Sequence, residues 1–175
     1  KPASLDFAQA AALPLTTITA WELLFHRMPY AFDGGGAGKS LLVIAGGGGV
    51  GSIAIQLAKR AGFTVIATAS RQDSIDWSRA MGADHVITHR EPLAPQLKAL
   101  GFDTVDAALN LADTDRYWTE LGELLAPLGH VGLIVEPRGE LRIGDPYKAK
   151  CIGIHWEMMF GRARFATPDR NGHDP

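Results

Sequence analysis

The chain has 175 residues, of which 46% are hydrophobic, so it is long and apolar enough to fold around one sizeable core. Its formal net charge of −2 gives no general attraction to nucleic acid or to an anionic membrane, and no apolar run reaches the length of a membrane span. The single cysteine, Cys151, cannot form an internal disulfide. We therefore expect a globular protein of the reducing cytoplasm that binds neither nucleic acid nor membrane.

Two short helices are predicted at the start of the chain. The first begins near Ser4, whose hydroxyl suits an N-cap, and Pro14 interrupts it. The second runs from about Thr16 to about Arg27 and carries apolar residues on one side. A glycine-containing loop, residues 29–39, then leads into the most informative part of the chain.

Residues 41–62 combine a strand, a glycine turn and a helix. Residues 41–45 are all apolar, as in a strand that is buried on both faces. Five of the next six residues are glycine, and a helical pattern then runs to Gly62, which ends it. In this context a G-x-G-x-x-G motif indicates a dinucleotide site, and a plain connecting loop is the alternative.

Gly46, Gly48 and Gly51 supply the motif. We expect Gly46 to allow the tight turn, Gly48 to let a pyrophosphate approach the backbone, and Gly51 to let the helix pack closely on the strand. The free N–H groups at the start of the helix, together with its positive dipole end, would hold the phosphates. The predicted pyrophosphate-binding residues are Gly46, Gly48, Gly49, Val50 and Gly51.

Strands and helices alternate through the rest of the chain. Further strands are expected over residues 63–68, 85–88, 103–109 and 130–135 and from Ile152 to Met159, with a turn at 127–129. Helices are expected after a capping-box pattern at 70–73 and over 113–125, and residues 92–100 form either a short helix or an irregular crossover. This alternation predicts an α/β fold, a doubly wound parallel six-stranded Rossmann sheet in the order 3-2-1-4-5-6 with helices on both faces. A ligand would then lie outside the carboxyl ends of the strands.

The end of the second strand lacks the carboxylate that usually binds the ribose of NAD. The first carboxylate there is Asp73, one turn into the helix. Ser70 and Arg71 could instead hydrogen-bond and pair with a 2′-phosphate, which favours NADP(H) over NAD. The alternatives are that Ser70 is an N-cap and Arg71 a solvated side chain. His89, after the third strand, borders either the adenosine pocket or an exposed loop.

Four segments resemble the nucleotide-binding domain of medium-chain dehydrogenases/reductases, in the quinone-oxidoreductase-like branch. They are residues 11–21, 45–62, 81–87 and 128–131, and they follow the order and spacing of the family. The strand at 154–160 is similar to that of a subgroup named zinc-type alcohol dehydrogenases.

This resemblance implies a two-domain enzyme in which a GroES-like catalytic domain flanks the nucleotide domain and the substrate lies between them. Because the chain opens on Lys1 and its first residues resemble the interior of a longer protein, we expect an excised half. Residues 1–30 would be junction helices, 31–160 the dinucleotide-binding domain, and 161–175 an irregular tail. The catalytic residues would lie mainly outside the chain, so the chain alone would be inactive.

Zinc-dependent members of the family carry a cysteine ligand near residues 12–14, where this chain has none. Its six histidines show no ligand spacing, so we expect no zinc in this chain. Some members bind the 2′-phosphate with a Lys and a Tyr. Ser74 and His89 stand at the matching positions here, so Arg71 would do more of that work.

The resemblance implies hydride transfer from NADPH to a quinone or to an activated C=C bond of an enone or enal, without zinc. Asn110 and Leu111 would lie under a ribose, and Val135 and Glu136 would approach the nicotinamide. Two threonines of the second helix, Thr16 and Thr17, match positions near the carboxamide, although they are equally typical of helix-start polarity.

Three other functions stay open at this point. The first is a zinc-dependent alcohol dehydrogenase whose ligands all lie outside the chain. The second is a methyltransferase, which the full G-x-G-x-x-G motif and the junction helix disfavour. The third is a non-catalytic nucleotide sensor or structural module.

The last strand suggests a partner. From Ile152 to Met159 apolar residues alternate, as in a strand with one covered face. In the resembling family this strand often pairs with its copy across a two-fold axis, which implies a homodimer. The alternative is an ordinary edge strand protected by Lys148 and Lys150.

Overall fold

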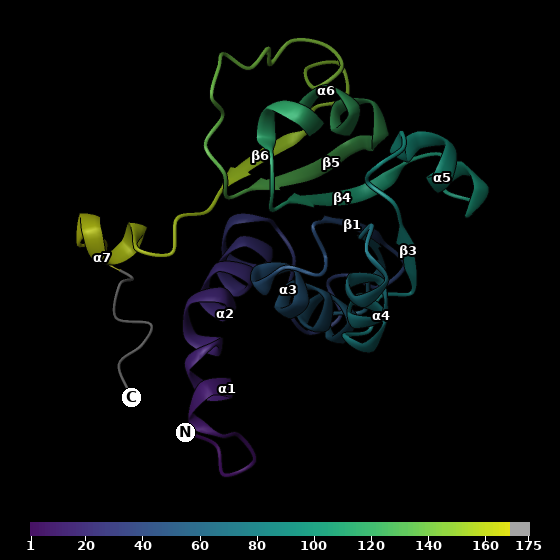
Figure 1. Ribbon diagram of the computed structural model, residues 1–175. Coiled ribbons are helices and arrows are strands. Elements are labelled where there is room, and N and C mark those ends of the chain that lie inside the picture. The colour runs from purple at the N-terminus through teal and green to yellow at the C-terminus, as the bar shows by residue number, and fades with distance from the viewer. Residues whose placement is uncertain (169–175) are drawn as a thin grey trace.

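The computed structural model describes residues 1–168, which form a six-stranded sheet in the order β3-β2-β1-β4-β5-β6 (Figure 1). Every neighbouring pair of strands is parallel, which confirms the predicted doubly wound order. The strands are β1 (Ser40–Ile44), β2 (Thr64–Thr68), β3 (His85–Ile87), β4 (Val105–Asn110), β5 (Leu125–Leu133) and β6 (Gly153–Trp156).

Helices cover both faces of the sheet. Figure 1 shows α2, α3 and α4 on one side and α5 and α6 on the other, with α7 beyond the end of β6. The helices are α1 (Phe7–Ala11), α2 (Leu13–Glu22), the π-helix η1 (Leu23–Arg27), α3 (Gly49–Arg60), α4 (Gln72–Ala80), α5 (Leu93–Ala99), α6 (Thr114–Leu124) and α7 (Gly161–Phe165). No helix within residues 1–168 is long and apolar enough to cross a membrane.

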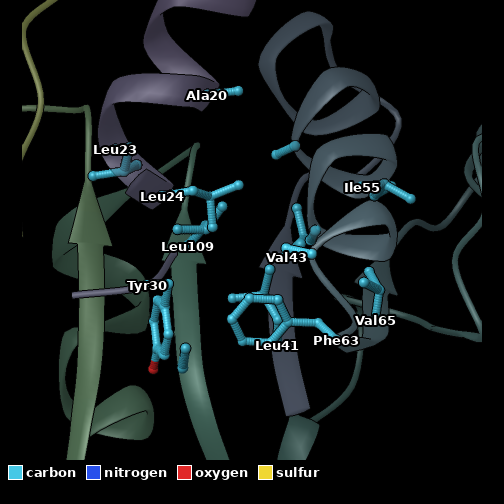
Figure 2. Close-up of a cluster of buried hydrophobic side chains, with 14 of the residues drawn as sticks. Ala20, Leu23, Leu24, Tyr30, Leu41, Val43, Ile55, Phe63, Val65 and Leu109 are labelled. Carbon is cyan, nitrogen blue, oxygen red and sulfur yellow. The ribbon is translucent and has the colours of Figure 1, made fainter. Parts of the chain in front are cut away.

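The core forms two layers because the side chains of β1 alternate between the faces of the sheet. Leu41 and Val43 join the cluster under α2 and α3, which Figure 2 shows around Leu24 and Ile55. Leu42 and Ile44 join the cluster under α5 and α6. All five residues of β1 are buried, as expected for the central strand of a sheet that is covered on both faces.

The N-terminal helices differ in detail from the prediction. The first helix is capped by Asp6 rather than Ser4, because Asp6 and Gln9 form a reciprocal capping box. The second helix begins at Leu13, with Pro14 in its first turn, where no backbone N–H is needed. It continues as the π-helix η1, whose last N–H bond runs from Met28 to the carbonyl of Leu23.

Two strand boundaries were predicted wrongly. β5 begins at Leu125, so the turn expected at 127–129 lies inside this strand. The pairing register of β4 with β5 shifts between Val105 and Ala107, and this irregularity accommodates the extra residues of β5. β6 spans Gly153–Trp156 rather than Ile152 to Met159, because β5, its partner, ends at Leu133, opposite Trp156.

The expected irregular tail is partly helical, since α7 occupies Gly161–Phe165. The remainder of that prediction, residues 169–175, lies outside the described residues.

Candidate functional site

The glycine loop lies at the carboxyl end of β1, next to the point where β1 and β4 meet. These strands are neighbours in the sheet, but the chain leaves β1 toward β2 and returns to β4 only after β3. Such a reversal opens a crevice at the carboxyl ends of the strands. The glycine loop, residues 45–49, follows β1 at this end and leads directly into α3.

The glycines of the loop are required by close packing. A Cβ on Gly51 would lie 2.4 Å from the carbonyl oxygen of Ala45, so only glycine lets α3 begin so near β1. A Cβ on Gly46 would lie 2.7 Å from the Cβ of Ala67 in β2. The role predicted for Gly46 was a tight turn, but the left-handed residue of this turn is Ala45, with φ 63°. Gly46 instead allows the loop to pack against β2.

The end of β2 holds the loop in place. The hydroxyl of Thr68, which is fully buried, accepts a hydrogen bond from the N–H of Ala45 at 3.0 Å. The N–H of Gly46 donates to the carbonyl of Thr68 at 3.1 Å. This buried threonine, which the sequence analysis did not single out, ties the glycine loop to the strand that leads to Ser70 and Arg71.

The start of α3 presents backbone donors to solvent. Gly48 is its N-cap and makes no side-chain capping bond, while Gly47, Gly48 and Gly49 are all exposed. The nearest atom to a Cβ on Gly48 would be the carbonyl oxygen of Ala45 at 3.2 Å, so the outer side of this residue is open. N–H groups at a helix start that have no side-chain cap are a suitable binding surface for a phosphate.

A pocket of 270 Å³ adjoins the loop and unites several of the predicted residues. Gly48, Ser70, Arg71 and His89 line it together, although they come from three separate stretches of the fold, which follow β1, β2 and β3. Its full lining is Ala45, Gly47, Gly48, Thr68, Ala69, Ser70, Arg71, Ser74 and His89. The pocket therefore has the glycine loop on one side and the start of α4 on the other.

Ser70 is not the N-cap of α4. That position belongs to Arg71, which makes no side-chain capping bond, so the predicted capping box at 70–73 is wrong. The reason is the backbone of Arg71, which is still extended, with φ −104° and ψ 144°. Ser70 and Arg71 both line the pocket, and Ser74, one helical turn further on, lines it too.

The pocket is electropositive on its β3 side. Burial lowers the pKa of His89, and the guanidinium groups of Arg116, Arg90 and Arg71 lower it further. His89 is therefore neutral near pH 7, and Arg116 donates a hydrogen bond to its carbonyl oxygen. Arg71 lines the pocket and no carboxylate does, and this lining suits an anionic group.

The residues predicted after β4 have other partners. The side chain of Asn110 is fully buried: its amide donates to the carbonyl of Asp113 at 3.1 Å, and its oxygen accepts from the N–H of Ala112 at 3.3 Å. Asn110 therefore holds the turn before α6. Leu111 packs against the core cluster under α2 and α3.

Val135 and Glu136 follow β5 at the same edge of the sheet but do not line the pocket. The carbonyl of Val135 accepts a hydrogen bond from the buried hydroxyl of Thr114, which fixes this stretch to α6. Glu136 is exposed.

The structure separates the two threonines of α2. Thr16 faces the glycine loop, since a Cβ on Gly49 would lie 3.1 Å from its Cγ2. Its hydroxyl donates to the carbonyl of Ala12 at 2.9 Å. Thr17 instead lines a separate, apolar hollow of 540 Å³ with Pro14 and Ile18.

The described residues do not provide a zinc site. Within residues 1–168, no three side chains of His, Cys, Asp or Glu gather closely enough to hold a metal ion. Two histidines do meet, with His130 Nδ1 3.0 Å from His155 Nε2, but no third ligand joins them there.

Comparison with known proteins gives this geometry a context. Residues 49–148 match the family described as zinc-binding dehydrogenase. A zinc-type alcohol dehydrogenase-like protein of Staphylococcus aureus is 42% identical over 169 residues, which cover 96% of this chain and 50% of that protein. The chloroplastic NADPH-dependent alkenal/one oxidoreductase of Arabidopsis thaliana is 40% identical over 114 residues, 65% of this chain and 28% of that protein. The chain thus spans half the length of its staphylococcal relative.

Solved structures are similar over nearly the whole chain. A protein from Rhizobium etli CFN 42, named as a zinc-dependent alcohol dehydrogenase, is 43% identical, with a TM-score of 0.87 over 98% of this chain and 50% of its own. A mycobacterial protein solved with NADPH is 27% identical, with a TM-score of 0.76 over 94% of this chain and 51% of its own. An NAD-dependent alcohol dehydrogenase is 28% identical, with a TM-score of 0.77 over 98% and 49%.

Proposed function

Since the chain belongs to the zinc-binding dehydrogenase family, within the medium-chain dehydrogenases/reductases, we propose that it binds NADP(H) for hydride transfer to a quinone or an activated C=C bond. It is the cofactor-binding domain of an oxidoreductase.

The lining of the pocket beside the glycine loop is the observation that favours NADP(H) over NAD(H). Its lining holds Ser70, Arg71 and His89 and contains no carboxylate that could bind a ribose 2′-hydroxyl. A planar guanidinium such as that of Arg71 matches phosphate geometry with two parallel donors. The relatives support the proposal without deciding it, because one similar structure holds NADPH and another is named NAD-dependent.

The backbone of the glycine loop leaves room for the pyrophosphate of a dinucleotide. Gly48 leaves the backbone open to a pyrophosphate, and the N–H groups of Gly49 and Val50 begin α3, which has no side-chain cap. Ser70 and Arg71 would hold the 2′-phosphate, and Thr16 would border the loop from α2. The nucleotide, when bound, supplies the hydride, and these residues bind and orient it.

The substrate proposal is supported by the name of the Arabidopsis relative. The alkenal/one oxidoreductase reduces the class of acceptor that its name gives. For the longer protein, we propose that residues 1–30 join the nucleotide domain at 31–160 to a separate catalytic domain, which would supply the proton donor and the substrate contacts.

A titration of this chain with NADPH and with NADH tests the nucleotide. We expect NADPH to bind at least about tenfold more tightly, because a charge-assisted contact contributes about 1.5–3 kcal/mol. Arg71→Ala should remove that preference. Arg79→Ala is the matched control, since Arg79 is exposed on the same helix and does not line the pocket. Equal affinities in the wild-type chain would overturn the proposal.

A zinc-dependent alcohol dehydrogenase is the second candidate, because the staphylococcal and Rhizobium relatives carry zinc in their names. Its ligands would have to lie outside residues 1–168. Metal analysis of the purified full-length protein separates the two candidates. Stoichiometric zinc together with alcohol oxidation would favour the second, and enone or quinone reduction without zinc would favour the first.

A further inference from the structure

The glycine loop and α4 are in direct contact. A Cβ on Gly47 would lie 3.0 Å from the Cβ of Ser74, and one on Gly46 would lie 3.3 Å from the hydroxyl of Ser78. These two sides therefore meet at van der Waals distance with no side chain between them. Because they also form opposite sides of the 270 Å³ pocket, any shift of α4 changes the width of that pocket.

A chain of two hydrogen bonds links the same two sides. The indole Nε1 of Trp77, in α4, donates to the hydroxyl of Ser52 at 2.7 Å. That hydroxyl in turn donates to the carbonyl of Gly48 at 2.7 Å, in the middle of the loop. Ser52 is buried, with 7% of its surface exposed, whereas half of the surface of Trp77 is exposed.

The exposure of Trp77 makes its hydrogen bond informative. Because half of Trp77 is exposed, it contributes less to the hydrophobic core than a fully buried tryptophan would. Core packing alone therefore does not explain a tryptophan at this position. The next polar contact between α3 and the end of α4 joins Gln56, in the second half of α3, to Met81, the C-cap of α4. Within residues 1–168, the Trp77–Ser52 bond is thus the hydrogen bond that joins α4 to the start of α3, beside the loop.

We propose that Trp77 is a positioning residue, which, through Ser52 and Gly48, sets the separation between the 5′-phosphate and 2′-phosphate sides of the pocket. The inference rests on the proposed function, because it takes the ligand to be the adenosine 2′,5′-bisphosphate end of NADP(H). Trp77 itself touches neither phosphate, since it does not line the pocket.

The separation matters only to a ligand that contacts both sides. Adenosine 2′,5′-bisphosphate reaches the glycine loop and the Ser70–Arg71 side together. ADP engages the loop alone, and 2′-AMP engages the Ser70–Arg71 side alone. Losing the Trp77 bond should therefore weaken the first ligand and leave the other two nearly unchanged.

The test is a calorimetric titration of all three ligands into the wild-type chain and into Trp77→Phe, Ser52→Ala and the double variant. Trp77→Phe keeps an aromatic ring and removes the donor. We expect it to weaken the bisphosphate about three- to tenfold, as for the loss of one hydrogen bond, and to change ADP and 2′-AMP less than twofold. In the Ser52→Ala background the same change should have no further effect.

The outcomes separate the two proposals. If the wild-type chain binds none of the ligands, the proposed function fails, and this inference fails with it. If the wild-type chain binds the bisphosphate but Trp77→Phe weakens all three ligands equally, or none, the positioning role is overturned while the NADP(H) assignment stands. Additive effects of Trp77→Phe and Ser52→Ala would also overturn it, and unfolding curves of each variant verify that it is folded.

Discussion

At the scale of single residues, Glu157 stands apart because its side chain is fully buried at the end of β6. Its carboxylate accepts a hydrogen bond from Arg27 Nε at 2.7 Å, and the buried Glu22 pairs with the same guanidinium at 3.0 Å. Glu22 also pairs with Arg162 of α7 at 2.7 Å. Burial raises the pKa of Glu157 to about 7; Arg27 opposes the shift and Glu22 adds to it.

The stability of the fold should therefore depend on pH through Glu157. The folded state keeps a proton that the unfolded chain, with an ordinary pKa of 4.5, has already released. The resulting stabilisation is complete below that pKa and is lost as the pH rises to about 7. Between pH 5 and pH 8 the free energy of unfolding of the wild type should fall by roughly 1–3 kcal/mol relative to that of Glu157→Gln, because each unit of pKa difference corresponds to about 1.4 kcal/mol.

Denaturant unfolding of both proteins across this pH range measures the difference. Subtracting one curve from the other removes the opposite contribution of His89, His130 and His155, whose pKa values are lowered and which are present in both proteins. Glu136→Gln, at an exposed position, serves as the control. A flat difference between wild type and Glu157→Gln would contradict the prediction.

The positions of individual residues in the fold were predictable where the motif fixes the backbone. Gly48 and Gly51 follow from the G-x-G-x-x-G spacing, and Ser70 and Arg71 from their distance to it. Asn110 was placed correctly at the end of β4, but its side chain is used by the turn before α6. Sequence spacing locates a residue along the chain, whereas side-chain partners depend on segments that only folding brings together.

At the scale of elements, the existence and order of all six strands were predictable from apolar runs, while their ends were not. β6 stops where its partner stops, and β5 gains residues through a register shift opposite β4. Both boundaries are properties of a strand pair, so neither strand specifies them alone.

The loop between β5 and β6 is anchored on α6 by an aromatic pair. The rings of Trp118 and Tyr147 stack at 4.1 Å, and the hydroxyl of Tyr147 donates to the carbonyl of Trp118 at 2.7 Å. Gly122 makes room for this contact, since a Cβ there would lie 2.6 Å from the Tyr147 ring.

Removing parts of this anchor should give graded losses of stability. Tyr147→Phe deletes one buried hydrogen bond and should cost about 1 kcal/mol, whereas Tyr147→Ala also empties the ring site and should cost about 3–5 kcal/mol. Urea unfolding monitored by circular dichroism measures both. If Tyr147→Phe and Tyr147→Ala lowered the free energy of unfolding by the same amount, the stacked ring would contribute nothing to stability.

At the scale of the whole molecule, β6 is the outer edge of the sheet, opposite β3. Trp156 in this strand is 47% exposed, and Met158 and Phe160 just beyond it are about half exposed. An apolar, unpaired strand edge is a template for pairing with another chain. We propose that two copies join through β6 about a two-fold axis, giving a continuous sheet.

Light scattering coupled to gel filtration tests this assembly. We expect a mass of two chains for the wild type and of one chain for Trp156→Lys, because the charge would be buried at the pairing edge. Phe165→Lys, at an exposed position of α7, should stay dimeric. A wild-type mass equal to one chain at high concentration would contradict the proposal.

The sequence by itself determined the parallel Rossmann sheet, the position of the glycine loop and the family, because each depends on local periodicity and on short motifs with fixed backbone demands. Only the tertiary structure decided which side chains share a pocket. Gly48, Ser70 and His89 meet because parallel strands bring their carboxyl ends to one edge. It also decided that Trp77 bonds to Ser52 and that Glu157 is buried with Glu22, since both pairs join segments far apart in the chain.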